Sequence, residues 1–239
     1  MIVCQPFLSS IFQKRAAVGG QSGGFAQMAP IMQGFMDIGP LIVKNRGFLA
    51  KIFTNLLVQL AITYYVFEHY PVTDHKWLFF FASLACIIII AGSNLPYWAK
   101  ALVFAVFSYM SGRVLAIYKE KYSEEVIREG IIGAMGIFAI MFLVGAAIPI
   151  LGEKFGWGLF FALLGLLVAR IVTILNGKIS EYKKWLSGAG IGIFGLFVMY
   201  DTNNILKRAS YYDGDFVTAS LDYYLDIINL VQDVIGYNN

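Results

Sequence analysis

A succession of long apolar segments fills most of this chain. From Phe48 onward the sequence divides into predominantly apolar runs of about 17 to 22 residues, the length that a helix needs to cross the hydrocarbon core of a bilayer. We place these runs near residues 48–67, 77–93, 97–118, 130–150, 155–175, 186–206 and 216–235. The prediction is therefore an all-α integral membrane protein with seven transmembrane helices.

The composition supports a membrane protein and excludes several other classes. Hydrophobic residues make up 59% of the chain and charged residues only 14%, well outside the usage of soluble proteins. A net charge of +3 is too small to indicate nucleic-acid binding. Cys4 and Cys86 lie in unrelated segments, and His69 and His75 share one short loop, so neither pair predicts a disulfide framework or a metal cluster. We expect the lipid bilayer as a partner, no nucleic acid and no cofactor.

The N-terminal region differs from the rest. Residues 1–46 contain paired glycines, Pro30 and Pro40 among Gln, Ser and Met, a mixture that interrupts long helices. We therefore predict a flexible N-terminal tail over 1–46 and a transmembrane domain over 47–239.

Two aspartates lie inside predicted membrane segments, where an acidic side chain is energetically unfavourable. Asp201 lies in the sixth run and Asp226 in the seventh, and only the short segment 207–215 separates the runs. So short a connection makes the two helices antiparallel neighbours, which allows the carboxylates to face each other. An acidic residue inside a membrane segment is by default a functional-site hypothesis.

The seventh run also carries a polar stripe. Asp222, Asp226, Asn229 and Asp233 are spaced four, three and four residues apart, which keeps them on one face of a helix. In a soluble protein the same pattern would indicate an amphipathic surface helix, but the apolar chain argues against that interpretation. We expect Asp222 and Asn229 to line the same interior surface as Asp226.

A second stripe follows the first run. Lys51, Asn55, Gln59 and Thr63 recur at steps of four, again on one helical face. Such residues commonly hold membrane helices together by hydrogen bonds, and this is the ordinary explanation for the stripe. Lys51 and Gln59 are nevertheless candidates for supporting polar groups around the aspartates.

The ends of the domain resemble a known family. Residues 223–230, Tyr-Tyr-Leu-Asp-Ile-Ile-Asn-Leu, preceded by Tyr-Asp-Thr-Asn at 200–203, resemble the closing signature of the transmembrane Bax inhibitor motif family. Residues 48–53 and 57–60 are similar to its opening helix. The chain length and the tail before the first helix also resemble the branch called Golgi anti-apoptotic proteins.

The resemblance implies a fold and a function. The fold would be seven helices with the C-terminal helix central and surrounded by the other six. The function would be a pH-sensitive calcium leak, not an enzyme, linked in eukaryotic relatives to inhibition of cell death and to apoptosis-regulating membrane proteins. The location would be the endoplasmic reticulum or Golgi membrane, or the inner membrane in a bacterium. The paired aspartates of the family map onto Asp201 and Asp226.

The chemistry of the pair is compatible with this role. Two carboxylates within hydrogen-bond reach in a low-dielectric site cannot both ionise cheaply, so they share a proton. Loss of that proton either separates the two helices or recruits a cation, and hard oxygen ligands suit calcium. We therefore expect acidification to favour the closed arrangement. Further oxygen atoms could come from Asp222, Asn203, Asn204 and Asn229, and the nearest candidates for a basic partner are Lys100 and Lys51.

Three other functions remain open. An intramembrane aspartyl protease also needs two proton-sharing aspartates, but its second aspartate belongs to a Gly-x-Gly-Asp motif, and here Tyr-Tyr-Leu precedes Asp226. A proton-coupled transporter uses membrane carboxylates as proton relays, although the paired interrupted helices typical of such proteins are missing from this sequence. A membrane adaptor without transport activity is the third.

Overall fold

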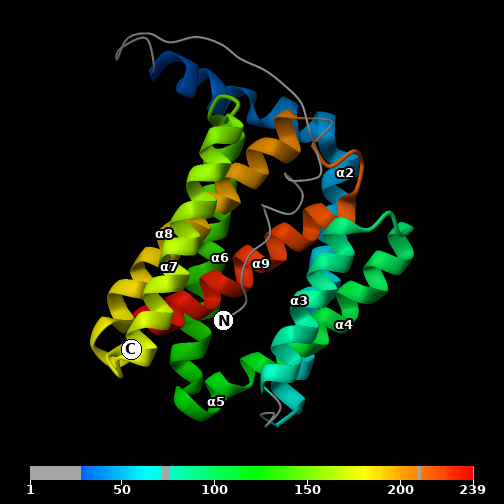
Figure 1. Ribbon diagram of the computed structural model, residues 1–239. Coiled ribbons are helices and arrows are strands. Elements are labelled where there is room, and N and C mark those ends of the chain that lie inside the picture. The colour runs from blue at the N-terminus through cyan, green and yellow to red at the C-terminus, as the bar shows by residue number, and fades with distance from the viewer. Residues whose placement is uncertain (1–27, 72–75, 209–210, 239) are drawn as a thin grey trace.

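The computed structural model describes residues 28–71, 76–208 and 211–238, and every regular element in these ranges is helical (Figure 1). The helices are α2 (Met28–His69), α3 (Lys76–Gly92), α4 (Tyr97–Leu115), α5 (Ile117–Lys121), α6 (Glu124–Ala147), α7 (Glu153–Leu175), α8 (Ile179–Lys207) and α9 (Phe216–Tyr237). Each predicted apolar run corresponds to one long helix, with α5 added after α4.

Among the described residues, four segments are long and apolar enough to cross a membrane. They are Gly34–His69, Tyr97–Lys121, Glu124–Ala147 and Glu153–Leu175, and α3 contributes the shorter apolar stretch Phe81–Gly92. Large apolar side chains also cover the outside of these helices, among them Leu57 and Phe161, which are 65% and 62% exposed. In water so much exposed apolar surface would be unfavourable, whereas lipid accommodates it. The chain is therefore a multi-pass membrane protein.

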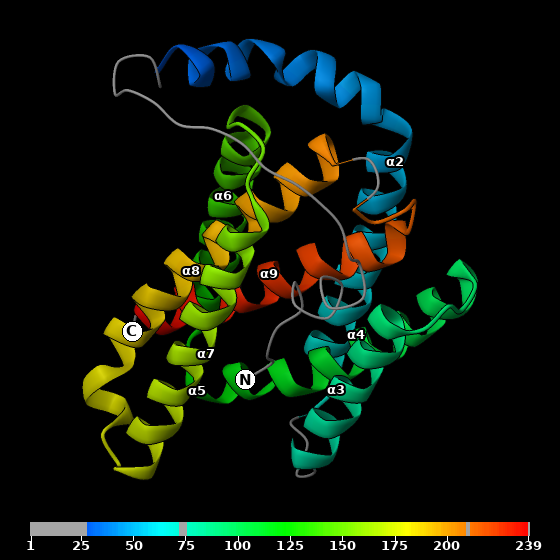
Figure 2. The ribbon, with the colours of Figure 1, turned by 45° about the horizontal axis from the view of Figure 1, so that its top comes forward.

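Helix α2 begins much earlier than expected. Residues 28–46, predicted as part of a flexible tail, belong to the same helix as the first apolar run, and residues 1–27 lie outside the described residues. Pro40 lies inside α2, where a proline removes one backbone hydrogen bond and kinks a helix without having to end it. Figure 2 shows α2 changing direction, so that its N-terminal part lies across one end of the bundle. The Asn45 side chain donates to the Leu206 carbonyl at 3.2 Å and thereby attaches this part to α8.

Two other helices, α6 and α8, begin before their predicted apolar runs. Helix α6 starts at Glu124 rather than near residue 130, since the Ser123 hydroxyl accepts a hydrogen bond from the Val126 amide at 3.4 Å and caps the helix. Helix α8 starts at Ile179 rather than near residue 186, directly after a tight turn. In that turn Gly177 adopts a φ of +67°, a left-handed conformation that favours glycine and ends α7.

Helix α9 positions the candidate site. It crosses the bundle with α6, α7 and α8 on one side and α2, α3 and α4 on the other (Figures 1 and 2). Every residue from Val217 to Leu230 is buried. Tyr224 packs edge-on against Phe104 and Phe107 of α4, while Tyr223 packs edge-on against Phe138 of α6. The polar residues of α9 in this stretch therefore face protein rather than lipid.

Candidate functional site

Helices α8 and α9 bring Asp201 and Asp226 together inside the bundle. The two helices pack along each other after the short loop at 208–215, and the side chains of the two aspartates lie within hydrogen-bonding reach. Both residues are buried, with exposed fractions of 1% and 4%. Among the described residues, no other group donates a hydrogen bond to either carboxyl oxygen of Asp201 or to Oδ2 of Asp226. Because two carboxylates offer only acceptors, a hydrogen bond between them requires one shared proton.

Asp222 is a third buried acid beside the pair. It lies one turn before Asp226 on α9 and is 2% exposed. The Tyr212 hydroxyl, from the loop before α9, donates to Asp222 Oδ2 at 2.8 Å. Burial, reinforced by the Asp222 carboxylate, raises the pKa of Tyr212 well above its usual value, so this hydroxyl keeps its proton and remains a donor. The other oxygen, Asp222 Oδ1, has no donor within the described part of the chain.

Lys100 and Lys51, the basic residues expected near the pair, contact other groups. The ammonium group of Lys100 pairs with Asp215 at 2.5 Å, and Asp215 in turn caps α9 by accepting from the amides of Val217 and Thr218. Lys51 is exposed, and its ammonium group lies 6.0 Å from the centre of the Phe216 ring. Within residues 28–71, 76–208 and 211–238, no Lys, Arg or His forms an ion pair with Asp201, Asp222 or Asp226.

The polar stripe of α2 connects helices, as its ordinary explanation predicts. Its side chains make hydrogen bonds to α4 and α9, joining Asn55 to Ser220, Gln59 to Ser108 and Thr63 to Tyr224. Gln59 is 2% exposed, and its other hydrogen bond goes to Asn55 of the same helix. Gln59 therefore supports the packing around α9, and its hydrogen bonds within the described part of the chain go to Asn55 and Ser108 rather than to the aspartate pair.

The three asparagines predicted as supporting groups have separate environments. Asn203 faces the turn between α6 and α7, where its amide donates to the carbonyls of Gly145, Ile148 and Pro149 and its oxygen accepts from the Leu151 amide. Asn229 is buried and donates to the Leu225 carbonyl of its own helix at 2.7 Å. Asn204 is fully buried in the last turns of α8. The side chain of Asn203 thus makes its hydrogen bonds to the backbone of the α6–α7 turn rather than to the aspartate pair.

Two basic residues at the C-terminal end of α8 bind the same turn. Lys207 donates to the Ile148 carbonyl and Arg208 to the Leu151 carbonyl. Together with Asn203 they fix the C-terminal end of α8 to the α6–α7 turn.

A buried ion pair near the far end of α9 was not predicted. Arg170 reaches from α7 to Asp233 and also donates to the Leu186 carbonyl of α8. Gly190 provides the space, because a Cβ at this position would clash with the carboxyl group of Asp233. The only signal in the sequence was the spacing of Asp233, two helical turns after Asp226 on the same face.

No group of three or more His, Cys, Asp or Glu side chains is arranged to hold a metal ion among the residues that the structure describes. The site therefore consists of two acids in contact, Asp201 and Asp226, a third acid beside them, and a scaffold of polar bonds between α2, α4, α6, α8 and α9.

Comparison with known proteins places this arrangement in a family. Residues 45–236 match the family described as "Inhibitor of apoptosis-promoting Bax1". "Bax inhibitor 1" of Schizosaccharomyces pombe is 25% identical over 195 residues, which cover 77% of this chain and 73% of that protein. "Protein LIFEGUARD 1" of Arabidopsis thaliana is 25% identical over 236 residues, covering 90% and 96% of the two chains.

A viral relative matches over a shorter stretch. The "Golgi anti-apoptotic protein" of Vaccinia virus strain Lister is 38% identical over 78 residues, 33% of this chain and 32% of that protein. The family match covers nearly all of the helical domain, from the middle of α2 to the end of α9. The chain therefore belongs to the Bax inhibitor family.

Proposed function

We propose that this protein is a pH-sensitive calcium leak channel in which the Asp201–Asp226 pair controls the path between α8 and α9. In this proposal all seven long helices cross the membrane, and α9 is the central helix. The observation that carries the proposal is the contact between two buried acids. Both carboxyl oxygens of Asp201, and Oδ2 of Asp226, receive no hydrogen bond from any other described group. The burial of α9 from Val217 to Leu230 supports its central position.

The pair supplies a switch because its proton holds two helices together. With one proton shared, a charge-assisted hydrogen bond joins α8 to α9. Without the proton, two negative charges face each other, and Asp222 adds a third acid nearby. Lys100, Arg170, Lys207 and Arg208 are committed to other partners, so the repulsion has to be relieved by helix separation, by water or by a cation.

This mechanism fixes the sign of the pH response. Acidification supplies the shared proton and favours the closed arrangement, while a rise in pH removes it and favours calcium passage. Calcium is here the transported ion, and it suits the site because it prefers carboxylate oxygens and accepts water for the remaining ligands.

Calcium efflux from liposomes that contain the purified full chain tests the proposal. We expect efflux to rise with pH in the wild type, and Asp201→Asn and Asp226→Asn each to abolish this dependence, because an amide keeps the shape but does not titrate. Glu129→Gln changes an exposed acid of α6 and serves as the matched control, with an unchanged pH profile. A pH dependence that persists in both asparagine variants would remove the pair from the mechanism.

We further propose that the leak serves an anti-apoptotic role in an intracellular membrane. The family description and the name of the viral relative support this role. Cells that express the chain should survive a death stimulus that depends on calcium release better than cells that express Asp226→Asn. Equal protection by both proteins would favour an adaptor that regulates apoptosis without transport.

A further inference from the structure

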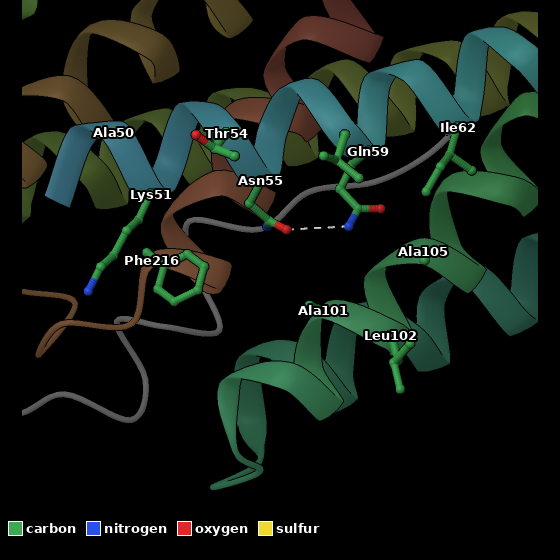
Figure 3. Close-up of a pocket in the computed structure, with 11 residues that line it drawn as sticks. Ala50, Lys51, Thr54, Asn55, Gln59, Ile62, Ala101, Leu102, Ala105 and Phe216 are labelled. Carbon is green, nitrogen blue, oxygen red and sulfur yellow. Dashed lines mark hydrogen bonds between the residues drawn. The ribbon is translucent and has the colours of Figure 1, made fainter. Parts of the chain in front are cut away.

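A groove lies between α2 and α4 (Figure 3), and neither Asp201 nor Asp226 is among the residues that line it. Its volume is about 580 Å³, within the roughly 300 to 1,000 Å³ of clefts that hold small molecules. Ala101 and Ala105 form its α4 wall, and their small side chains leave the space between the two helices open. Both helices belong to segments apolar enough to cross a membrane, so the groove opens toward lipid rather than toward water.

One end of the groove carries the aromatic residues that are typical of the boundary between membrane and water. There the Lys51 ammonium group lies over the ring of Phe216, the first residue of α9, and that ring packs against Tyr97, the first residue of α4. Next to Tyr97, Trp98 is 69% exposed, as expected for an aromatic residue at the headgroup level. We therefore expect Lys51 to lie at the level of the lipid headgroups.

No acid of the described residues compensates the charge at this end. Among the described residues no acid pairs with Lys51, and the closest acidic cap, Asp215, is already bonded to Lys100 and to the start of α9. One turn deeper, Thr54 presents an exposed hydroxyl on the same wall as Lys51. Deeper still the α4 wall is apolar, with Leu102 60% exposed beside the alanines, while Asn55 and Gln59 on the α2 wall are hydrogen-bonded to each other.

We propose that this groove binds one anionic phospholipid. The phosphate would lie at Lys51, an ester oxygen would accept from the Thr54 hydroxyl, and one acyl chain would lie along Ala101 and Ala105. The order of groups from cation to hydroxyl to apolar wall matches the order of groups in the lipid, and the free positive charge selects an anionic headgroup over a zwitterionic one.

Native mass spectrometry of the purified full chain tests this assignment. The protein is mixed with equal amounts of phosphatidylglycerol and phosphatidylcholine that carry the same acyl chains, and the retained lipids are counted. We expect wild-type protein to prefer phosphatidylglycerol by about fivefold, the effect of one lysine near an anionic headgroup. Lys51→Gln should reduce this preference to less than about twofold, whereas Lys178→Gln, at an exposed lysine before α8, should leave it unchanged.

A second pair of variants tests the groove itself. Ala105→Leu fills the space and should abolish retention of both lipids, while Ala105→Ser keeps the space and should retain them. Thermal unfolding of each variant shows that the fold is intact. The assignment is overturned if the wild type shows no preference, if Lys51→Gln and Lys178→Gln lose it equally, or if Ala105→Leu retains lipid as the wild type does.

Discussion

Gly190 and Asp233 illustrate how single residues determine the packing of this bundle. Asp233 approaches the backbone of α8 so closely that a methyl group at position 190 would overlap its carboxyl group, with the guanidinium group of Arg170 next to it. The ion pair is buried, with side-chain exposures of 18% for Arg170 and 5% for Asp233. A buried ion pair tolerates little displacement, because each charge depends on the other for compensation.

We therefore expect Gly190→Ala to destabilise the protein by about 1 to 3 kcal/mol, the usual cost of overpacking a well-packed interior. Gly192→Ala is the matched control in the same helix, because a Cβ there meets no atom within 4 Å. That change should be neutral or stabilising by roughly 0.5 to 1 kcal/mol, since alanine favours a helix over glycine. Thermal unfolding in detergent measures both, and equal effects at the two positions would contradict the packing argument.

At the scale of elements, the start of α9 depends on Asp215. Its Oδ1 accepts from the Val217 and Thr218 amides, while its Oδ2 accepts from the Thr218 hydroxyl and pairs with Lys100 of α4. One side chain thus both caps the buried helix and joins it to a neighbour. Both functions stabilise a helix whose next residues are all buried.

Removing the two functions separately should have graded effects. Asp215→Asn keeps a capping oxygen but loses the ion pair, whereas Asp215→Ala loses both and should cost about 1 kcal/mol more, the value of a helix cap. Asp213→Asn, at an exposed residue of the same loop, is the control and should change little, because asparagine accepts its φ of +47°. Unfolding temperatures that do not separate the two Asp215 variants would argue against the cap.

The helices show how far hydropathy alone predicts structure. Apolar runs located every long helix, because the bilayer imposes their length. The runs missed the starts of α6 and α8 and the first half of α2, because these parts of the helices contain polar residues that hydropathy does not assign to a membrane span. Conversely, α8 and α9 do not qualify as candidate spans by composition, although apolar runs predicted them, because their acids and amides lower the hydropathy.

The site could be predicted only where helix periodicity decided the outcome. The short loop and the spacing of polar residues indicated that Asp201 and Asp226 would be neighbours. The partners of Lys100, Arg170 and Asn203 could not be predicted, because long side chains and amides reach groups whose positions depend on how separate helices pack. Lys100 binds an acid in a loop, Arg170 binds an acid in another helix, and Asn203 binds backbone carbonyls. No sequence pattern links these residues to their partners.

Across the whole molecule, the polar connections join the helices into groups, and we expect each group to move as a unit. The α6–α7 turn is attached to the end of α8 by Asn203, Lys207 and Arg208, and the start of α9 is attached to α2 and α4. At the opposite end, Arg170 joins α7, α8 and α9. Separation of the aspartate pair should therefore widen the first end, while the second end stays closed.

Spin labels measure this movement. In a background without Cys4 and Cys86, we expect the distance between labels at the exposed positions Asn94 and Lys154 to increase when the pH is raised from 5 to 8. Labels at Lys121 and Lys178, near the Arg170 end, should keep their distance. With Asp226→Asn neither distance should depend on pH. Equal changes in both pairs would show that the bundle expands as a whole.

The burial of α9 also has a consequence for biosynthesis. This helix follows all the other described helices in the chain, so the ribosome completes it after α2, α4, α6 and α8 have been synthesised. Until α9 arrives, the groups that it will cover, including Asp201 and the Asn55 side chain, have no partner from it. In a bilayer such polar groups are costly to leave unsatisfied. The insertion machinery therefore has to shield an incomplete bundle until its most buried helix is released.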